Sequence, residues 1–198
     1  CNFFVSNHLS YLDIPILGSN FPIRFVAKSE VASWPIFGFL SKLARTIFIY
    51  RNKFDTLNQK DKIKNILLLK EKILIFPEGT TSDGNRVIDF KSSSFSAVEK
   101  ENFMIQPITL IYAELNGIPI NRWLRPLIAW YGDMEFQPHL SALVNLRSIK
   151  VKLIFSEPVN SQLFSNRKEL SHYLEKIIKT SYTSTLTKKL AKYKYNWQ

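Results

Sequence analysis

The stretch FFVSNHLSYLD, residues 3–13, places polar side chains directly after a short apolar run. Its first four residues have the aromatic and β-branched composition of a strand. Ser10 suits the N-cap of a helix, and Ser10 and Asp13 have the spacing of a capping box. The stretch therefore predicts a strand that ends beside His8 and turns at once into a helix.

Similar apolar runs recur along the chain and alternate with helical patterns. The predicted strands are 3–6, 23–28, 46–51, 72–75, 103–112, 127–133 and 150–158. Alternation of this kind is typical of βαβ units. The chain has 198 residues, of which 45% are hydrophobic, and this suits one core. We therefore expect an α/β fold: a single domain over 1–198, with a mostly parallel central sheet flanked by helices.

Three further segments shape this expectation. Residues 54–72 predict a surface helix with an apolar face, formed by Leu57, Ile63, Ile66, Leu67, Leu68 and Leu69. Residues 29–44, which contain Trp34 and Phe37, fit either a core helix or a helix in a membrane interface. Residues 116–126 carry Gly, Pro and Arg and predict a loop or lid between two strands.

The charge and the cysteine content limit the partners. Lys and Arg number 27 against 16 Asp and Glu, and the formal charge of +11 favours anionic partners. The lysine-rich C-terminal helix fits a solvated helix end or an anionic membrane surface. The single cysteine, Cys1, cannot form an intrachain disulfide. No apolar run is long enough to span a bilayer, but the abrupt start suggests a missing N-terminal anchoring segment.

His8 and Asp13 are the first candidates for chemistry. Residues five apart on one helix lie roughly 140° apart, so the two side chains can meet only if His8 precedes the helix. A carboxylate behind a neutral imidazole is the arrangement of a general base. The alternative is that Asp13 only caps the helix and His8 binds a backbone carbonyl. No G-x-S-x-G motif is present, so the nucleophile is expected to be a hydroxyl of the substrate.

Two more motifs follow predicted strands. FPEGTTSDG, residues 76–84, predicts a turn with exposed backbone N–H groups that suit an anion. Arg51 ends the run TIFIYR, and its guanidinium matches phosphate or carboxylate groups. Ligands collect at the carboxyl ends of strands in parallel sheets, so His8, Arg51 and Glu78 are expected at one edge.

These motifs, in this order, resemble the glycerolipid acyltransferase family. NHLSYLD matches its N-H-x-x-x-x-D block, FIYR its second block, FPEGTTS its third and FMIQPITLIY its fourth, over residues 7 to 112. The resemblance implies that His8 deprotonates the acceptor hydroxyl and that Asp13 holds His8. It further implies that the acceptor is bound by Arg51, Glu78, Gly79, Thr80 and Lys91, and that Pro107 shapes a pocket.

By the same resemblance, the expected reaction is acyl transfer to a lysolipid at the cytoplasmic face of a membrane. The donor is acyl-CoA or acyl-carrier protein, no metal or other cofactor takes part, and 1-acylglycerol-3-phosphate is the first choice of acceptor. RPLIAWYGDMEFQPHL, residues 125–140, resembles acyltransferases for lyso-ornithine lipid, which is the alternative acceptor. A non-catalytic lipid-binding module is a further alternative, whereas no motif supports nucleic-acid binding.

Overall fold

The computed structural model describes residues 1–29, 46–49 and 55–194. The helices and strands of these parts are β1 (Phe3–Ser6), α1 (Asp13–Asn20), β2 (Ile23–Lys28), β3 (Ile47–Ile49), α3 (Asp55–Leu68), β4 (Lys72–Ile75), β5 (Met104–Leu115), β6 (Ile118–Pro119), α4 (Phe136–Val144), β7 (Ile149–Phe155), β8 (Val159–Asn160) and α5 (Arg167–Lys194). Three 3₁₀ turns complete them, η2 (Ser92–Phe95), η3 (Arg125–Leu127) and η4 (Ser161–Leu163).

The sheet has the strand order β3-β2-β4-β1-β5-β6, and β7 and β8 also pair with β5. The pairs among β1 to β5 are parallel, whereas β6, β7 and β8 run antiparallel to β5. The expected fold class, an α/β domain with a mostly parallel sheet, is confirmed. β1 is central, and all four of its residues are buried, as is usual for a parallel strand covered on both faces.

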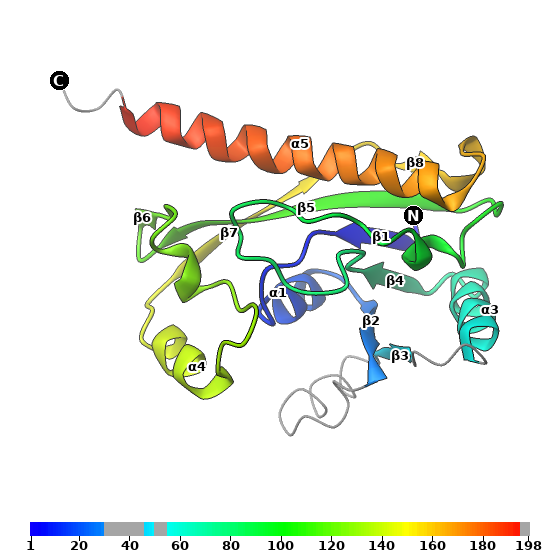
Figure 1. The fold of residues 1–198 in the computed structure, drawn as a ribbon, viewed down its shortest axis with the longest axis horizontal. Helices are drawn as coiled ribbons and strands as arrows, with labels where there is room; N and C mark the ends of the chain where they lie inside the picture. The colour runs from blue at the N-terminus through cyan, green and yellow to red at the C-terminus, as the bar shows by residue number, and fades with distance from the viewer. Residues whose placement is uncertain (30–45, 50–54, 195–198) are drawn as a thin grey trace.

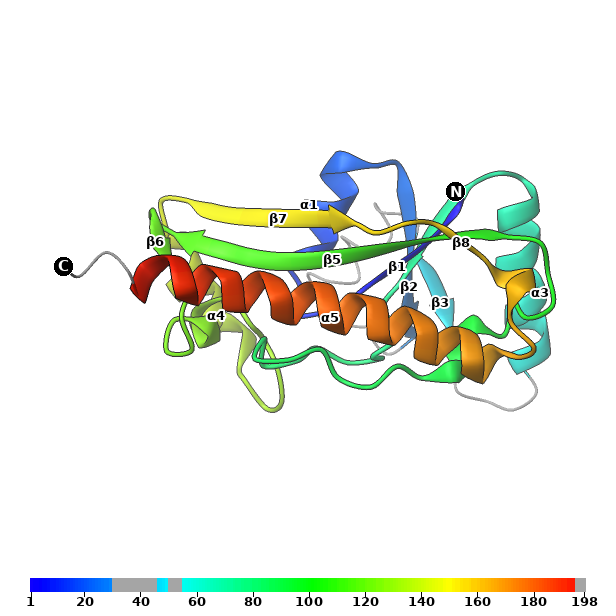
Figure 2. The ribbon, with the colours of Figure 1, turned by 90° about the horizontal axis from the view of Figure 1, so that it is seen from above.

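Helices cover both faces of the sheet. The long helix α5 runs along β5 on one face, while α1 lies on the opposite face (Figure 1). Figure 2 shows α5 from above, nearly aligned with β5 over most of its length. Leu170, Leu174 and Ile178 of α5 recur at helical spacing and are buried in the core, as the sequence predicts.

The register of β1 and β4 brings two sequence motifs together. Val5 pairs with Ile75 in this parallel ladder. His8 and Glu78 each follow their paired residue by three positions, so both emerge at the same carboxyl edge of the sheet. The strand register therefore brings the first and third motifs together.

Pro107 lies inside β5 and is buried, opposite Val5 of β1. Its carbonyl accepts a hydrogen bond from the backbone N–H of Ser156 at 3.2 Å. The nitrogen of a strand residue points to the same side as its carbonyl, so the missing N–H faces the break between β7 and β8. The proline therefore costs no hydrogen bond of the β1 ladder.

Two sequence expectations are wrong. Residues 127–133 form the end of η3 and irregular chain instead of a strand, because β7 and β8 already occupy the free edge of β5. The backbone N–H of Trp130 binds the carbonyl of Leu9 instead of a neighbouring strand. In the 54–72 helix, Leu68 and Leu69 are 60% and 72% exposed, since α3 ends at Leu68 and a further step of about 100° takes Leu68 off the face that buries Ile66 and Leu67.

Some expectations lie outside the described residues, namely the segment with Trp34 and Phe37 and the strand end with Arg51. Residues 116–126 do contain a loop, but it includes β6 and leads into η3 instead of a further strand. Among the described helices, none combines the length and the apolar character that a bilayer crossing requires.

Candidate active site

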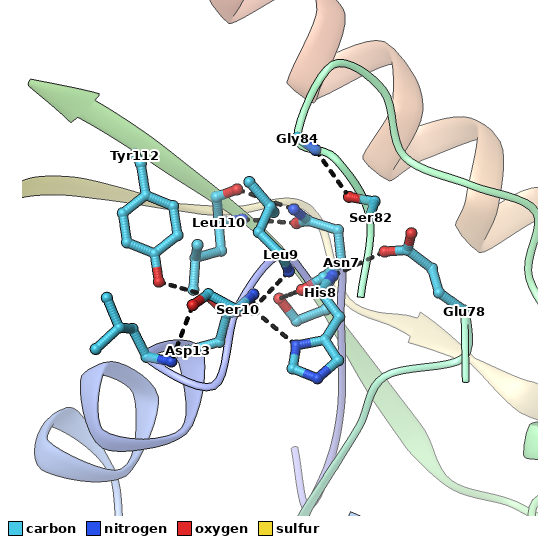
Figure 3. Close-up of polar contacts among 12 residues, drawn as sticks. Asn7, His8, Leu9, Ser10, Asp13, Glu78, Ser82, Gly84, Leu110 and Tyr112 are labelled. Atoms are coloured by element: carbon cyan, nitrogen blue, oxygen red, sulfur yellow. Dashed lines mark hydrogen bonds and ion pairs between the residues drawn. The ribbon is translucent and has the colours of Figure 1, made fainter. Parts of the chain in front are cut away.

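Asp13 is completely buried at the first turn of α1, where four groups donate to its carboxylate. Oδ2 accepts from Nδ1 of His8 at 2.7 Å and from the backbone N–H groups of Leu9 and Ser10 at 2.7 and 3.1 Å. Oδ1 accepts from the hydroxyl of Tyr112 at 2.6 Å (Figure 3). This donor set suits a carboxylate, which accepts hydrogen bonds and donates none.

The contacts of the expected capping box form in part, although α1 begins at Asp13 and its N-cap is Leu12 instead of Ser10. The Asp13 carboxylate reaches back to the N–H of Ser10, as such a box requires. The Ser10 hydroxyl, however, accepts from the N–H of Leu12 at 3.4 Å instead of from Asp13. The carboxylate thereby orders the turn between strand and helix, and this brings it within reach of the His8 ring.

His8 is held on three sides and open on the fourth. Its ring stacks on Phe76, with the ring centroids 4.0 Å apart and the planes at 12°. Its backbone N–H donates to Glu78, and its carbonyl accepts from the N–H of Ser82 at 2.9 Å. Among the described residues no group binds Nε2, and 17% of the His8 side chain is exposed. With Nδ1–H bound to Asp13, the Nε2 lone pair faces outward and can accept a proton.

At the end of β1, the side chain of Asn7 makes two hydrogen bonds to the backbone of Leu110, in the way that a strand residue would with its backbone. Its Nδ2 donates to the carbonyl of Leu110 at 2.9 Å, and its Oδ1 accepts from the N–H of Leu110 at 2.8 Å. Asn7 is completely buried. The amide therefore keeps β1 joined to β5 while the backbone leaves the sheet and turns toward Asp13.

Glu78 joins the first and third motifs from inside the protein. It is 1% exposed, and its Oε1 accepts from the N–H of His8 at 2.7 Å. Its Oε2 accepts from the N–H of Ile88 at 2.9 Å. Burial raises the pKa of Glu78 to about 8, although both backbone donors act in the opposite direction. The structure thus places Glu78 beneath the backbone of His8, and direct contact with an acceptor stays a prediction.

The loop after Glu78 brings together two other predicted residues. Gly79 has a φ of +68°, which favours glycine, and a Cβ there would lie 2.8 Å from Nζ of Lys91. Lys91 is exposed, and no hydrogen bond or ion pair joins its ammonium group to another described residue. Thr80 is exposed in the same loop. A cationic group thus lies over the turn that was expected to bind an anion.

A second set of contacts holds the C-terminal end of this loop, at Gly84 and Asn85. The hydroxyl of Tyr182, on α5, donates to the carbonyl of Gly84 at 2.6 Å. Arg125 binds Oδ1 of Asn85 through Nη1. A small hollow of about 10 Å³, partly open to solvent, lies beside Tyr182 and Arg125. It is lined by Leu9, Tyr112, Ile120, Arg125, Ile128, Ala129, Tyr182 and Leu186.

Sequence reasoning overlooked two residues of the site. Tyr112 lies in a predicted strand, and the signal for its role is its hydroxyl, which needs a buried partner at the end of a long apolar run. Burial raises the pKa of Tyr112 well above its usual range, so the hydroxyl remains a donor to Asp13. Asn7 belongs to the first motif. Its role could have been inferred from its position, because it is a polar residue directly after an apolar strand. The structure brings His8, Asp13 and Glu78 together, and Pro107 lies within β5 beyond this hydrogen-bonded set.

The fold and the site define an α/β protein with a His–Asp pair at the carboxyl edge of a central strand. The sequence profile of the Acyltransferase family matches residues 3–111. The chain belongs to the Acyltransferase family, and its first and third motifs form the two halves of the site described above.

Individual relatives agree with this assignment. The lyso-ornithine lipid O-acyltransferase of Brucella abortus is 37% identical over 190 residues, which cover 92% of this chain and 71% of that protein. The protein of the same name from Rhizobium meliloti is 40% identical over 177 residues, or 85% of this chain and 61% of that protein. The crystal structure of the 1-acyl-sn-glycerophosphate acyltransferase PlsC from Thermotoga maritima matches with a TM-score of 0.60 and 27% identity, over 99% of this chain and 67% of that one.

Proposed function

We propose that the chain transfers an acyl group from a thioester donor, acyl-CoA or acyl-carrier protein, to a free hydroxyl of a lysolipid. The observation that carries the proposal is the geometry of His8. Its Nδ1 is bound to the buried carboxylate of Asp13, and no described residue forms a hydrogen bond with its Nε2. This is the arrangement of a general base, and membership of the Acyltransferase family supplies the reaction class.

The reaction then needs no protein nucleophile. Nε2 of His8 takes the proton of the acceptor hydroxyl as its oxygen attacks the thioester carbonyl. Asp13 stabilises the imidazolium that forms. When the tetrahedral intermediate collapses, the C–S bond breaks, an ester bond remains and the imidazolium returns its proton to the leaving thiolate. Each proton and bond is thereby accounted for, and we propose that no metal or other cofactor takes part.

The comparisons favour lyso-ornithine lipid as the acceptor. Relatives of that name are 37% and 40% identical to this chain. The sequence motifs alone placed 1-acylglycerol-3-phosphate first, and the relatives reverse this order. 1-Acylglycerol-3-phosphate (lysophosphatidate) remains the second candidate because PlsC from Thermotoga maritima has a similar fold at 27% identity. In addition, Lys91 has no partner among the described residues, and its ammonium group suits a phosphate.

The bacterial relatives also support a place at a membrane, since their acceptors are lipids. The net charge of +11 suits an anionic lipid surface, and the cytoplasmic face is the side we propose. A charged surface would concentrate the protein where a lysolipid is presented.

The test is an acceptor assay with the purified chain. Labelled acyl-CoA and labelled acyl-carrier protein are each supplied with lyso-ornithine lipid and with lysophosphatidate. We expect turnover of lyso-ornithine lipid to exceed that of lysophosphatidate. Exclusive turnover of lysophosphatidate would reverse the choice of acceptor, and a lack of turnover with every pair would refute the proposed reaction.

His8→Ala separates catalysis from binding. Loss of a general base lowers kcat by roughly 10²- to 10⁴-fold, while lysolipid binding is expected to persist. His172→Ala is the matched control, because His172 is exposed on α5. Unchanged turnover in His8→Ala would remove this residue from the mechanism and favour a lipid-binding module.

A further inference from the structure

The loop between β5 and η3 exposes apolar side chains that the reaction does not use. Trp123 is 87% exposed, and Ile118 of β6 and Leu127 of η3, on either side of it, are 59% and 36% exposed. Together with Arg122, which is also exposed, these residues form what we term the Trp123 face. A tryptophan that is almost fully exposed to solvent is unusual on a protein surface. Where it lies beside other exposed apolar side chains, it indicates an interaction site.

The loop is firmly held, so Trp123 is presented in a defined position. Ile120 precedes Trp123 and Ile128 follows it, and both are buried, with 8% and 1% of their surfaces exposed. The side chain of Asn121 accepts from the backbone N–H groups of Trp123 and Leu124 at 2.9 and 3.0 Å. The exposure of Trp123 is therefore a property of the fold.

Along the chain, the charges within this segment have one sign. Between Glu114 and Asp133 the sequence contains two arginines and no acidic residue, and Glu114 itself pairs with Lys150. Lys179 of α5 pairs with Asp89 and Glu175, and after it the chain contains four lysines and no acidic residue. Figures 1 and 2 place β6 and the C-terminal end of α5 at the same end of the molecule. Tyr182 and Leu186 of α5 line one pocket with Ile120, which confirms their proximity.

We propose that the Trp123 face and the C-terminal end of α5 dock the protein on an anionic lipid membrane. Tryptophan and aliphatic side chains with flanking arginines are typical of the membrane–water interface. Basic residues nearby are attracted by anionic headgroups. The face also adjoins the site: Arg125, two residues beyond Trp123, lies against Gly84 of the third motif. This inference rests on the proposed function, because it names the surface on which that reaction takes place.

Vesicle binding tests the proposal. Vesicles of phosphatidylcholine alone are compared with vesicles that also contain phosphatidylglycerol, and bound protein is measured by flotation. We expect strong binding to the anionic vesicles, a drop of about tenfold for Trp123→Ser and of about fivefold for Arg122→Gln. Leu163→Ser is the matched control, because Leu163 is 75% exposed just before the start of α5, at the opposite end. Unchanged binding of Trp123→Ser would overturn the proposal.

A second measurement identifies what covers the face. Bromine-labelled anionic lipid is expected to quench the fluorescence of Trp123, so the total quenching should be smaller in Trp123→Phe. Equal quenching in both proteins would contradict direct insertion. If the chain forms a dimer without lipid, and Trp123→Ser dissociates that dimer, the face belongs to a second copy and the proposal is wrong.

Activity in two lipid states separates this inference from the proposed function. With lysolipid dispersed in detergent, Trp123→Ser is expected to match the wild type. With the same lysolipid in anionic vesicles, its turnover should fall in proportion to binding. Inactivity of the wild type in both states would refute the proposed reaction, whereas equal turnover of both proteins on vesicles would refute the membrane face alone.

Discussion

The hydroxyl of Tyr112 donates to Oδ1 of Asp13 at 2.6 Å, on the side of the carboxylate that faces away from His8. Tyr112 comes from β5, while Asp13 begins α1, so this contact ties the turn that carries His8 to the sheet. The other carboxylate oxygen binds Nδ1 of His8 at 2.7 Å. The orientation of the proposed base therefore depends on a residue 99 positions away in the sequence.

Tyr112→Phe should loosen Asp13 without removing the base. We expect the free energy of unfolding to fall by about 1 to 3 kcal/mol, because a buried carboxylate oxygen loses its partner. A displaced Asp13 should also lower kcat, by up to about 10²-fold, with little change in KM. Urea denaturation and the kcat profile against pH are the measurements.

Tyr182→Phe is the control for this variant. It removes a similar buried hydroxyl, but one that donates to the carbonyl of Gly84 and not to Asp13. We expect a comparable loss of stability and an unchanged pH profile. A pH profile that shifts equally in both variants would show that Tyr112 has no special effect on Asp13.

Asp13→Asn tests whether the carboxylate orients His8. The asparagine amide cannot accept all four hydrogen bonds, and it no longer holds the proton on Nδ1 of His8. We expect kcat to fall by about 10³- to 10⁴-fold, as for the carboxylate of a catalytic triad. Single-turnover kinetics measure this, with circular dichroism as the check on folding. A loss below tenfold in a folded variant would contradict the orienting role.

Glu78 should make stability decline with rising pH. Burial raises its pKa from the usual 4.5 to about 8, so folded Glu78 keeps a proton that the unfolded chain releases. Its contribution is fully present below pH 4.5 and is lost as the pH rises through about 8, a change on the order of a few kcal/mol.

Denaturation from pH 5 to 9 measures this effect, with Glu78→Gln as the comparison. Glutamine does not titrate, so the stability advantage of the wild type over this variant should shrink as the pH rises. A constant difference across the range would show that Glu78 titrates near its usual pKa.

Asn7→Ala should destabilise the junction of β1 and β5. The variant leaves both the N–H and the carbonyl of buried Leu110 without the Asn7 amide, at a cost of about 2 to 4 kcal/mol. Chemical denaturation is the measurement. Asn145→Ala is the control, because this exposed amide binds one carbonyl at the end of α4 and should matter by less than about 1 kcal/mol.

Local patterns predicted much of the site. The strand-to-helix switch at residues 3–13 and the apolar strand before FPEGTTSDG were read correctly, because hydrophobic runs and capping residues act over a few positions. The same reasoning failed at 127–133. This apolar run does not form a strand, because β7 and β8 already pair with the available edge of β5. It also missed Tyr112, since its partner lies far away in the sequence.

By itself, the sequence determined the fold class, the order of the motifs and the imidazole and carboxylate placed five residues apart. The tertiary structure decided which groups surround them. The pairing of Val5 with Ile75 brought Glu78 under His8, and the pairing of β1 with β5 allowed Tyr112 to reach Asp13. These contacts depend on strand register and burial, which are set by the packing of the whole chain and not by any short segment.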